Sequence, residues 1–280
     1  EVHRLYEAAD SILGMPLSRL CFEGPEEELR QTINTQPALF VTCVACLRVL
    51  EERSIRADVT AGHSVGEYAA HVAAGAIDFQ DALPLVRRRG EIMTEVGSTH
   101  DGAMAAVIGL DDDKVAEACA KASSQGVIEI ANYNSPGQAV ISGETRAVEA
   151  ANANAKEAGA RMVMPLKVSG AFHSSLMSPA VPMLAAELAK TPFRDASLPV
   201  VANASADYVR AAAEIKSALE KQIAGSVHWT PSIKRMAGDG ADLFVEVGPG
   251  KVLAGLVKRI LGSAEIRNAG DVASIEALEI

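Results

Sequence analysis

Residues 62–66 have the pattern Gly-x-Ser-x-Gly, which constrains the fold of this chain more than any other stretch. The run before the pattern favours a β-strand and the run after it favours a helix. Between a strand and a helix the pattern is typical of a nucleophile elbow, a tight turn that exposes a serine above a sheet. We expect a side chain at Gly62 or Gly66 to collide with the backbone of this turn. The sequence therefore predicts Ser64 as a nucleophile and the Val65 N–H as a donor to an oxyanion.

A structural interpretation of the same residues stays open. Ser64 and Glu67 have the spacing of a capping box, in which each side chain bonds the other residue's backbone at a helix start. Many helices begin in this way without any chemistry. The strand before the pattern and the helix after it favour catalysis.

Composition limits the class of protein. The 280 residues are 49% hydrophobic, which is enough for one large core, or for a core and a small second one. The net charge of −10 argues against a nucleic-acid partner. We find no basic-then-apolar signal segment at the start and no apolar run of membrane-spanning length, so no membrane partner is expected.

Two of the four cysteines, Cys43 and Cys46, form a C-x-x-C pair that could indicate a redox or metal site. They lie in an apolar run of helical length, and no second Cys or His pair with ligand spacing accompanies them. Packing inside a buried helix is the favoured interpretation, with no metal bound. Without a disulfide pattern the expected compartment is the cytoplasm.

The order of elements predicts an α/β protein in two parts. Residues 102–167 read β-α-β-β-α-β, the ferredoxin-like arrangement, and are expected to form a small inserted domain. Residues 1–101 and 168–280 are then a larger, hydrolase-like domain with a parallel sheet that carries the elbow. Its other predicted helices lie at 1–13, 25–29, from Pro37 to about 53, and at 81–96, 179–190, 211–223 and from 252. Strands are predicted at 199–203 and 243–247.

Arg89 lies near the middle of the apolar stripe of the helix predicted at residues 81–96. A guanidinium that faces the core must be paired or must line a polar pocket. An internal salt bridge would satisfy it. A substrate carboxylate would also do so, because arginine binds carboxylates through two parallel hydrogen bonds. The residues alone leave both interpretations open.

A serine hydroxyl needs a base within hydrogen-bond reach to act as a nucleophile near pH 7. Of the six histidines, His173 is the best candidate, because it lies in a loop of small residues well after Ser64. His63 is next to Ser64, but its side chain is expected to point away. No acidic residue stands out as a third triad member, so a carbonyl or an amide could orient the imidazole instead.

Five stretches also match a known family in order and spacing. They are Gly-His-Ser-Val-Gly-Glu-Tyr at 62–68, Arg-Gly at 89–90, Asn-Tyr-Asn-Ser-Pro-Gly-Gln at 132–138, Gly-Ala-Phe-His at 170–173 and Val-Gly-Pro-Gly-Lys-Val-Leu at 247–253. Together they resemble the malonyl-CoA:acyl carrier protein transacylases, over nearly the whole chain. The resemblance implies ping-pong transfer of a malonyl group to the phosphopantetheine thiol of acyl carrier protein, the first committed supply step of fatty-acid synthesis. It also implies a coenzyme A thioester as substrate, no cofactor, and a monomer.

The resemblance further implies roles for individual residues. Ser64 attacks the malonyl thioester and His173 takes its proton. Arg89 matches the residue that binds the malonyl carboxylate. Gln222 matches the residue whose main-chain carbonyl orients the histidine. The other expected substrate-binding residues are Val65, Met93, Asn132, Asn134 and Phe172, of which Phe172 resembles the malonyl-selective form.

One part of the family pattern is not in this sequence. The family begins with a strand and a Gly-Gln-Gly-Ser-Gln loop whose glutamine supplies a second oxyanion N–H. Either the sequence is truncated, which is the expected reason, or the protein lacks this donor. Loss of one such donor costs about 100- to 1,000-fold in rate. Two other functions stay open: a serine hydrolase or thioesterase that resolves the ester with water, and a non-catalytic docking domain on the same fold.

Overall fold

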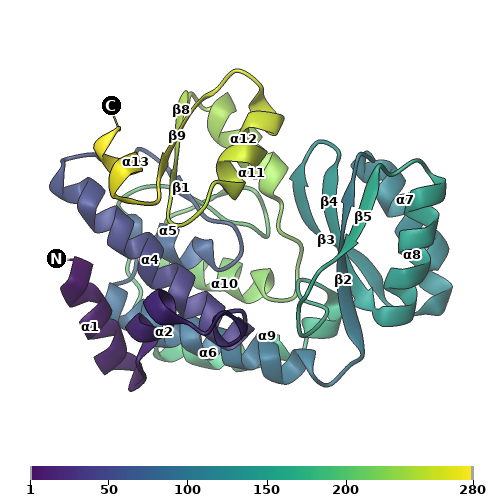
Figure 1. Ribbon diagram of the computed structural model, residues 1–280, viewed down its shortest axis with the longest axis horizontal. Coiled ribbons are helices and arrows are strands. Elements are labelled where there is room, and N and C mark those ends of the chain that lie inside the picture. Colours follow the sequence, from purple (N-terminus) through teal and green to yellow (C-terminus); the bar gives the residue numbers. More distant parts are fainter. Residues whose placement is uncertain (1, 279–280) are drawn as a thin grey trace.

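The structure is a computed structural model that describes residues 2–278 (Figure 1). It is a mixed α/β fold, mostly helical, with small sheets. Glu1, the predicted start of the first helix, and residues 279–280, the predicted end of the larger domain, lie outside the described residues.

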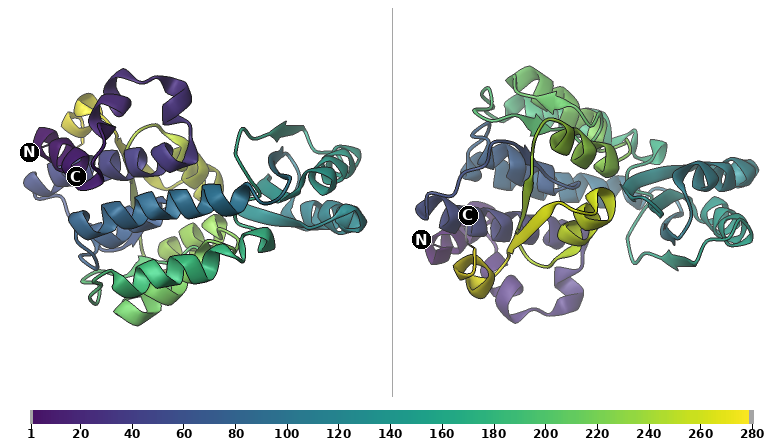
Figure 2. Two further views of the ribbon diagram at one scale, coloured as in Figure 1. Left: turned by 90° about the horizontal axis from the view of Figure 1, so that it is seen from below. Right: turned by 90° about the horizontal axis from the view of Figure 1, so that it is seen from above.

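The N-terminal third is helical. It comprises α1 (Val2–Leu13), α2 (Leu17–Glu23), α3 (Glu26–Leu29), α4 (Thr32–Glu52), α5 (Gly66–Ala73) and α6 (Phe79–Gly97). α4 and α6 pack side by side, and with α1 and α5 they enclose the largest hydrophobic core. Figure 2 shows α6 running through this core to the joint with the next segment.

Two expectations for α4 were wrong. The helix begins at Thr32 rather than at Pro37, because the polar stretch before the proline joins it. By length and composition alone, α4 is apolar enough over an 18-residue window to cross a membrane. Half of that window is buried inside the protein, and core helices of soluble proteins pass the same test.

Residues 102–167 lie at one end of the molecule (Figures 1 and 2). Four antiparallel strands in the order β3-β4-β2-β5 pack against two helices and have their own apolar cluster. The elements are β2 (Gly102–Ile108), α7 (Asp112–Ala122), β3 (Ile128–Ser135), β4 (Gln138–Glu144), α8 (Thr145–Glu157) and β5 (Met162–Pro165). The chain segments before and after this region touch at Gly97 and Gly170. A Cβ added at Gly170 would lie 2.7 Å from the Gly97 Cα.

The other strands form two small sheets among the described residues. β1 (Thr60–Ala61) pairs in parallel with β6 (Val200–Val201), and β7 (Tyr208–Val209) adds to β6 in the antiparallel sense. β8 (Leu243–Val247) and β9 (Glu265–Ala269) form a parallel pair. The first sheet positions the site, because β1 leads directly into residues 62–66.

The remaining helices are α9 (Ala180–Lys190), α10 (Ala212–Gln222), α11 (Trp229–Gly238), α12 (Val252–Leu261) and α13 (Val272–Glu276). Short 3₁₀ helices lie at Ser123–Gln125 and Ser175–Met177. The sequence did not predict α2, β7, β9, α11 or α13. The elements α2, β7 and α13 are short, and α11 carries Pro231 in its first turn, where a proline fits a helix but also resembles a loop.

Cys43 and Cys46 lie on α4, and both are free thiols. Burial raises the pKa of the Cys43 thiol to about 12, and the Cys43 sulfur packs so closely that a Cβ added at Gly248 would lie 2.4 Å from it. A thiol with so high a pKa is inert near neutral pH. Burial also raises the pKa of the Cys46 thiol, which lies in an apolar cluster with Leu50 and Ile275. Both side chains serve packing, as the sequence predicted.

Candidate active site

Ser64 occupies a strained turn between β1 and α5. Its φ angle is +52°, in the left-handed region that a side chain enters only at a cost of about 1–3 kcal/mol. The buried Asn203, just beyond β6, holds this turn: its Oδ1 accepts from the Ser64 N–H at 2.7 Å, and its Nδ2 donates to the Gly62 carbonyl at 2.7 Å. Asn203 was not predicted from the sequence. Its place at the end of the strand that pairs with β1 was the available signal.

The two glycines of the pattern differ in what they require. A Cβ added at Gly62 would lie 2.0 Å from the carbonyl carbon and oxygen of Gly66, which is an impossible contact. A Cβ added at Gly66 would have no heavy atom within 4 Å. The prediction of a collision at Gly66 was therefore wrong. The Gly66 backbone blocks a side chain at Gly62, whereas the space around the Gly66 Cα is open.

We expect Gly62→Ala to lower the free energy of unfolding by about 3 kcal/mol or more, since the backbone must move to admit the methyl group. Gly66→Ala is the matched control and should change it by less than about 1 kcal/mol, because the site is open and helical. Urea unfolding of the two variants measures this difference. Equal losses would contradict the steric argument.

The capping-box interpretation is not what the structure shows. Val65 is the N-cap of α5 and makes no side-chain cap hydrogen bond. The Ser64 Oγ lies 2.8 Å from His173 Nε2, and Glu67 turns its carboxylate inward to the Asn203 N–H. Within residues 2–278 the Val65 N–H donates to no backbone or side-chain acceptor, so it is available to an anion at the helix start.

His173 is buried, and its ring is held by two carbonyls. Nδ1 lies 3.0 Å from the Gln222 carbonyl oxygen and 3.1 Å from that of Gly225. A carbonyl only accepts hydrogen bonds, so Nδ1 carries the proton and Nε2 presents its lone pair to the Ser64 hydroxyl. Neither contact to Nδ1 comes from a carboxylate. His63 instead points to Asn134, with its Nε2 2.8 Å from Asn134 Oδ1.

Burial, and secondly the nearby charge of Arg89, lower the pKa of His173 to about 3. The imidazole is therefore neutral near pH 7, which is the form that can accept a proton. Because this pKa lies below the ordinary 6.5, the unfolded chain binds more protons between these values. The free energy of unfolding therefore does not depend on the protonation of His173 above pH 6.5. It falls as the pH is lowered from 6.5 toward the lowered pKa, because protonation then favours the unfolded chain.

The same shift predicts the pH dependence of the reaction with an acyl donor. We expect the rate of Ser64 acylation to show no inflection near pH 6.5, with the acid limb displaced toward the lowered pKa. Rapid-quench measurement of acylation between pH 5 and 8 checks this on the wild-type protein. A loss of rate centred near 6.5 would show that the imidazole titrates as an ordinary histidine.

Arg89 on α6 is 1% exposed, and its guanidinium points at the nucleophile. Nη2 lies 3.2 Å from Ser64 Oγ and donates to Gln222 Oε1 at 2.9 Å, while Nη1 donates to Gln36 Oε1 at 2.6 Å. The Tyr68 ring lies 5.6 Å from the guanidinium carbon. Among the described residues no carboxylate lies within the 4.0 Å of an ion pair with Arg89, so the internal salt bridge is not formed. Gln36, a polar residue near the start of α4, was missed from the sequence.

The other predicted residues lie around this centre at different depths. Met93 is buried one turn after Arg89 on α6, and its sulfur accepts from Gln36 Nε2 at 3.3 Å. Phe172 is buried next to His173 and packs into the main core. Asn132 and Asn134 are buried on β3, where Asn134 holds His63 and the Asn132 backbone bridges to the loop at Val227.

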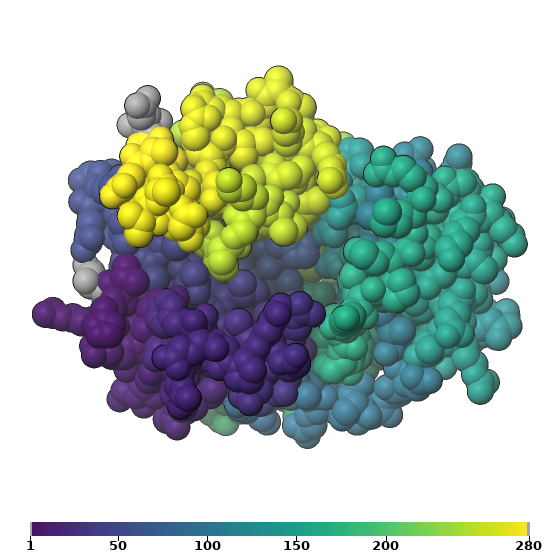
Figure 3. Space-filling model, in the orientation of Figure 1, coloured from purple at the N-terminus to yellow at the C-terminus, as the bar shows by residue number. Residues whose placement is uncertain are grey.

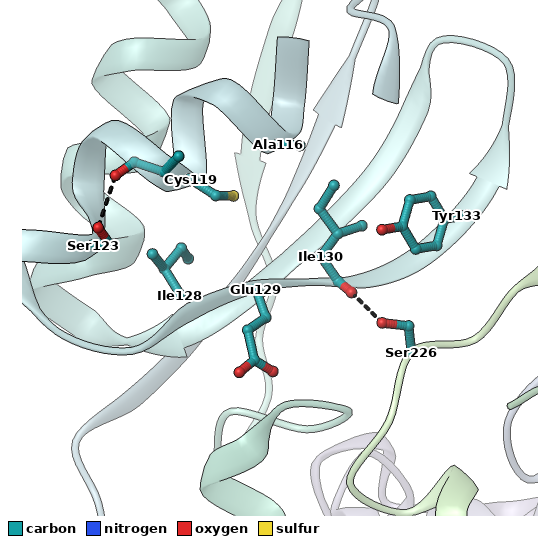
Figure 4. A pocket seen from close by; sticks show the side chains of 9 residues that line it. Ala116, Cys119, Ser123, Ile128, Glu129, Ile130, Tyr133 and Ser226 are labelled. Carbon is teal, nitrogen blue, oxygen red and sulfur yellow. Dashed lines mark hydrogen bonds between the residues drawn. The ribbon is translucent and has the colours of Figure 1, made fainter. Parts of the chain in front are cut away.

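The surface is hollowed where the C-terminal, N-terminal and 102–167 segments meet (Figure 3). A separate pocket of about 360 Å³ lies between α7, β3 and the loop of Ser226 (Figure 4). Its lining includes Cys119, Tyr133 and Glu129, and Ser226 donates to the Ile130 carbonyl. None of Ser64, His173 and Arg89 lines this pocket.

Comparison with known proteins shows the family of this chain. The sequence model of the family described as "Acyl transferase domain" matches residues 1–277. A malonyl CoA-acyl carrier protein transacylase of Bacillus subtilis (strain 168) is 46% identical over 258 residues, which cover 92% of this chain and 81% of the relative. The chain belongs to the malonyl-CoA:acyl carrier protein transacylase family.

Solved structures of this family have the same fold. An acyl carrier protein S-malonyltransferase of Vibrio cholerae superposes with a TM-score of 0.96 at 43% identity, covering 99% of this chain and 91% of that one. A malonyl-transacylase solved in complex with its type II polyketide acyl-carrier protein has a TM-score of 0.95 at 40% identity, with 98% and 89% covered. The family is one of acyltransferases, as the resemblance implied.

Proposed function

We propose that this protein transfers a malonyl group from malonyl-CoA to the phosphopantetheine thiol of acyl carrier protein through a malonyl ester of Ser64. One observation carries the proposal: the Ser64 hydroxyl lies 2.8 Å from the base His173 and 3.2 Å from the unpaired cation Arg89. A nucleophile, a base and an anion receptor thus converge on one oxygen. The names of the relatives support the same reaction.

In the first half-reaction Ser64 Oγ attacks the thioester carbonyl while its proton passes to His173 Nε2. The carbonyl oxygen becomes an oxyanion that the Val65 N–H can receive. When the carbon–sulfur bond breaks, the coenzyme A sulfur takes the proton from the imidazolium. The second half-reaction reverses these steps with the carrier thiol as nucleophile.

The two carbonyls at His173 Nδ1 replace the carboxylate of a triad. They fix the tautomer and stabilise the imidazolium through their dipoles when it forms. They do not offer a full negative charge, so they leave the pKa of the free imidazole low. We assign this orienting role to the main chain of Gln222 and Gly225.

The free malonyl carboxylate binds Arg89 in this proposal. The guanidinium donates to neutral amide oxygens, so no carboxylate of the described residues occupies its hydrogen bonds before substrate arrives. Arginine can hold a carboxylate through two hydrogen bonds in a buried site where the interaction is strong. Met93, Phe172, Asn132 and Asn134 would form the walls around the acyl group.

We also propose the division of the fold that the sequence predicted. Residues 102–167 would be a ferredoxin-like domain inserted into a hydrolase-like domain of residues 1–101 and 168–280, and their separate apolar clusters support it. The cytoplasmic location and the monomeric state stay predictions.

Mass spectrometry after exposure to malonyl-CoA tests the function. We expect the mass to rise by one malonyl group, with the modification on the peptide that contains Ser64. Addition of acyl carrier protein should remove the label into malonyl-carrier rather than into free malonate. Rapid release of malonate without carrier would indicate a thioesterase, and no label at all would indicate a docking domain.

Carrier recognition gives a further prediction. Acyl carrier protein is expected to be acidic, and this chain is itself acidic, so a local basic face is needed. Lys251, Lys258 and Arg259 lie at and along α12, and charge reversal of Lys258 should raise the KM for carrier about tenfold with little change in kcat. Lys190→Glu on α9 is the matched control. An unchanged KM would remove α12 from the docking surface.

A further inference from the structure

Glu67 is a buried carboxylate that the reaction described above does not use. Its side chain is fully buried on the first turn of α5. Oε2 accepts from Gln222 Nε2 at 2.6 Å and from the Asn203 N–H at 3.1 Å, whereas Oε1 has no hydrogen bond among the described residues and lies 3.8 Å from His71 Nε2. A buried carboxylate is costly, so its position beneath the nucleophile calls for a reason.

The Gln222 side chain is held in one orientation by its neighbours. Its NH₂ group donates to Glu67 Oε2 at 2.6 Å and to the Ser64 carbonyl at 3.0 Å, and its Oε1 accepts from Arg89 Nη2 at 2.9 Å. If the amide turned over, its NH₂ would face the guanidinium and its oxygen would face the carboxylate. Both contacts would then be repulsive. Glu67 therefore decides which end of the amide Arg89 meets.

We propose that Glu67 is a positioning residue for the acyl-carboxylate site: through the Gln222 amide it keeps the Arg89 guanidinium directed at Ser64. The inference rests on the proposed function, because it takes Arg89 as the receptor for the malonyl carboxylate. Glu67 touches neither the guanidinium nor the place where substrate would lie.

The indirect arrangement explains how a buried arginine can be supported and still bind an anion. Burial lowers the pKa of Arg89, and the nearby charge of Glu67 opposes that shift. A carboxylate in direct contact would occupy the hydrogen bonds that the malonyl group needs. With an amide between them, Glu67 compensates the charge and fixes the geometry without competing for the site.

Two substitutions separate this role from a general effect on folding. In Glu67→Gln the amide oxygen can still accept from Gln222, so the ratio of malonyl to acetyl kcat/KM should stay within about threefold of wild type. Glu67→Met removes the acceptor at similar volume. We expect it to lower that ratio at least about tenfold, through malonyl KM, while acetyl transfer changes much less.

Gln222→Met is a second test of the same link. It removes the side-chain amide and retains the main-chain carbonyl that holds His173. It should lower the ratio as Glu67→Met does, and the double variant should be no worse than either single one. If Glu67→Met does not fold, the retained ratio in Glu67→Gln and the lost ratio in Gln222→Met decide the matter. Any of three results would overturn the proposal. They are equal losses of kcat/KM with malonyl and acetyl donors in Glu67→Met, a lowered malonyl-to-acetyl ratio in Glu67→Gln, and additive losses in the double variant.

Wild-type protein is measured in parallel with both acyl donors. If it neither forms the Ser64 ester nor prefers malonyl, the proposed function fails. If it does both and Gln222→Met keeps the preference, only the role of Glu67 fails.

Discussion

Ser64→Ala should lose the malonyl label and lower transfer to acyl carrier protein by at least about 10⁴-fold. The expected loss is this large because the serine and its base act as one unit, and removal of either eliminates the covalent route. His173→Ala should lose nearly as much, and the double variant little more. Transfer measured with radiolabelled malonyl-CoA, together with intact mass, checks both.

The matched control for Ser64 is Ser175→Ala. Ser175 lies two residues after His173, and its hydroxyl donates to Glu129 rather than to the site. This variant should keep the label and the rate. If Ser64→Ala still carries a malonyl ester, the nucleophile is another residue and the elbow has a structural role only.

Arg89→Ala is expected to lower kcat/KM for malonyl-CoA by about 30-fold to several thousandfold, equivalent to roughly 2–5 kcal/mol for a lost buried charge pair. Acetyl-CoA has no second carboxylate, so its slower transfer should change little. The malonyl preference would then disappear. Parallel measurement of both donors with the same protein preparation gives the ratio.

Arg87→Ala is the control on the same helix. Arg87 is half-buried, but it pairs with Glu91 and donates to the Ile33 carbonyl, away from Ser64. Its removal should leave the ratio unchanged. Equal losses with malonyl and acetyl donors in Arg89→Ala would mean that the arginine supports folding and does not receive a carboxylate.

The sequence predicted much of this arrangement because the relevant signals are local. The glycine pattern around Ser64 and the apolar stripe around Arg89 each occupy one element, and their periodicity reveals the geometry. The choice between salt bridge and substrate receptor could not be made this way. It depends on Gln36, Gln222 and Ser64, which lie on different elements and meet Arg89 only in the folded chain.

The residues that were missed are those whose partners are distant in sequence. Asn203 holds the turn of Ser64 from 139 positions away, and its place at the end of a predicted strand does not show which turn it meets. The error at Gly66 has the same cause, because the collision belongs to the Cβ of Gly62 and becomes visible only when both backbones are placed. Short elements such as β7 and α13 carry too few residues to show a periodicity.

The neutral surroundings of Arg89 have a consequence for the energy of the whole catalytic cycle. The Arg89 cation lies in the interior and donates only to amide and hydroxyl oxygens, while Glu67 offsets its charge from the far side of the Gln222 amide. If Arg89 binds the malonyl carboxylate as proposed, formation of the ester places an anion directly against that cation. The acylated protein would then be electrostatically relaxed relative to the free protein.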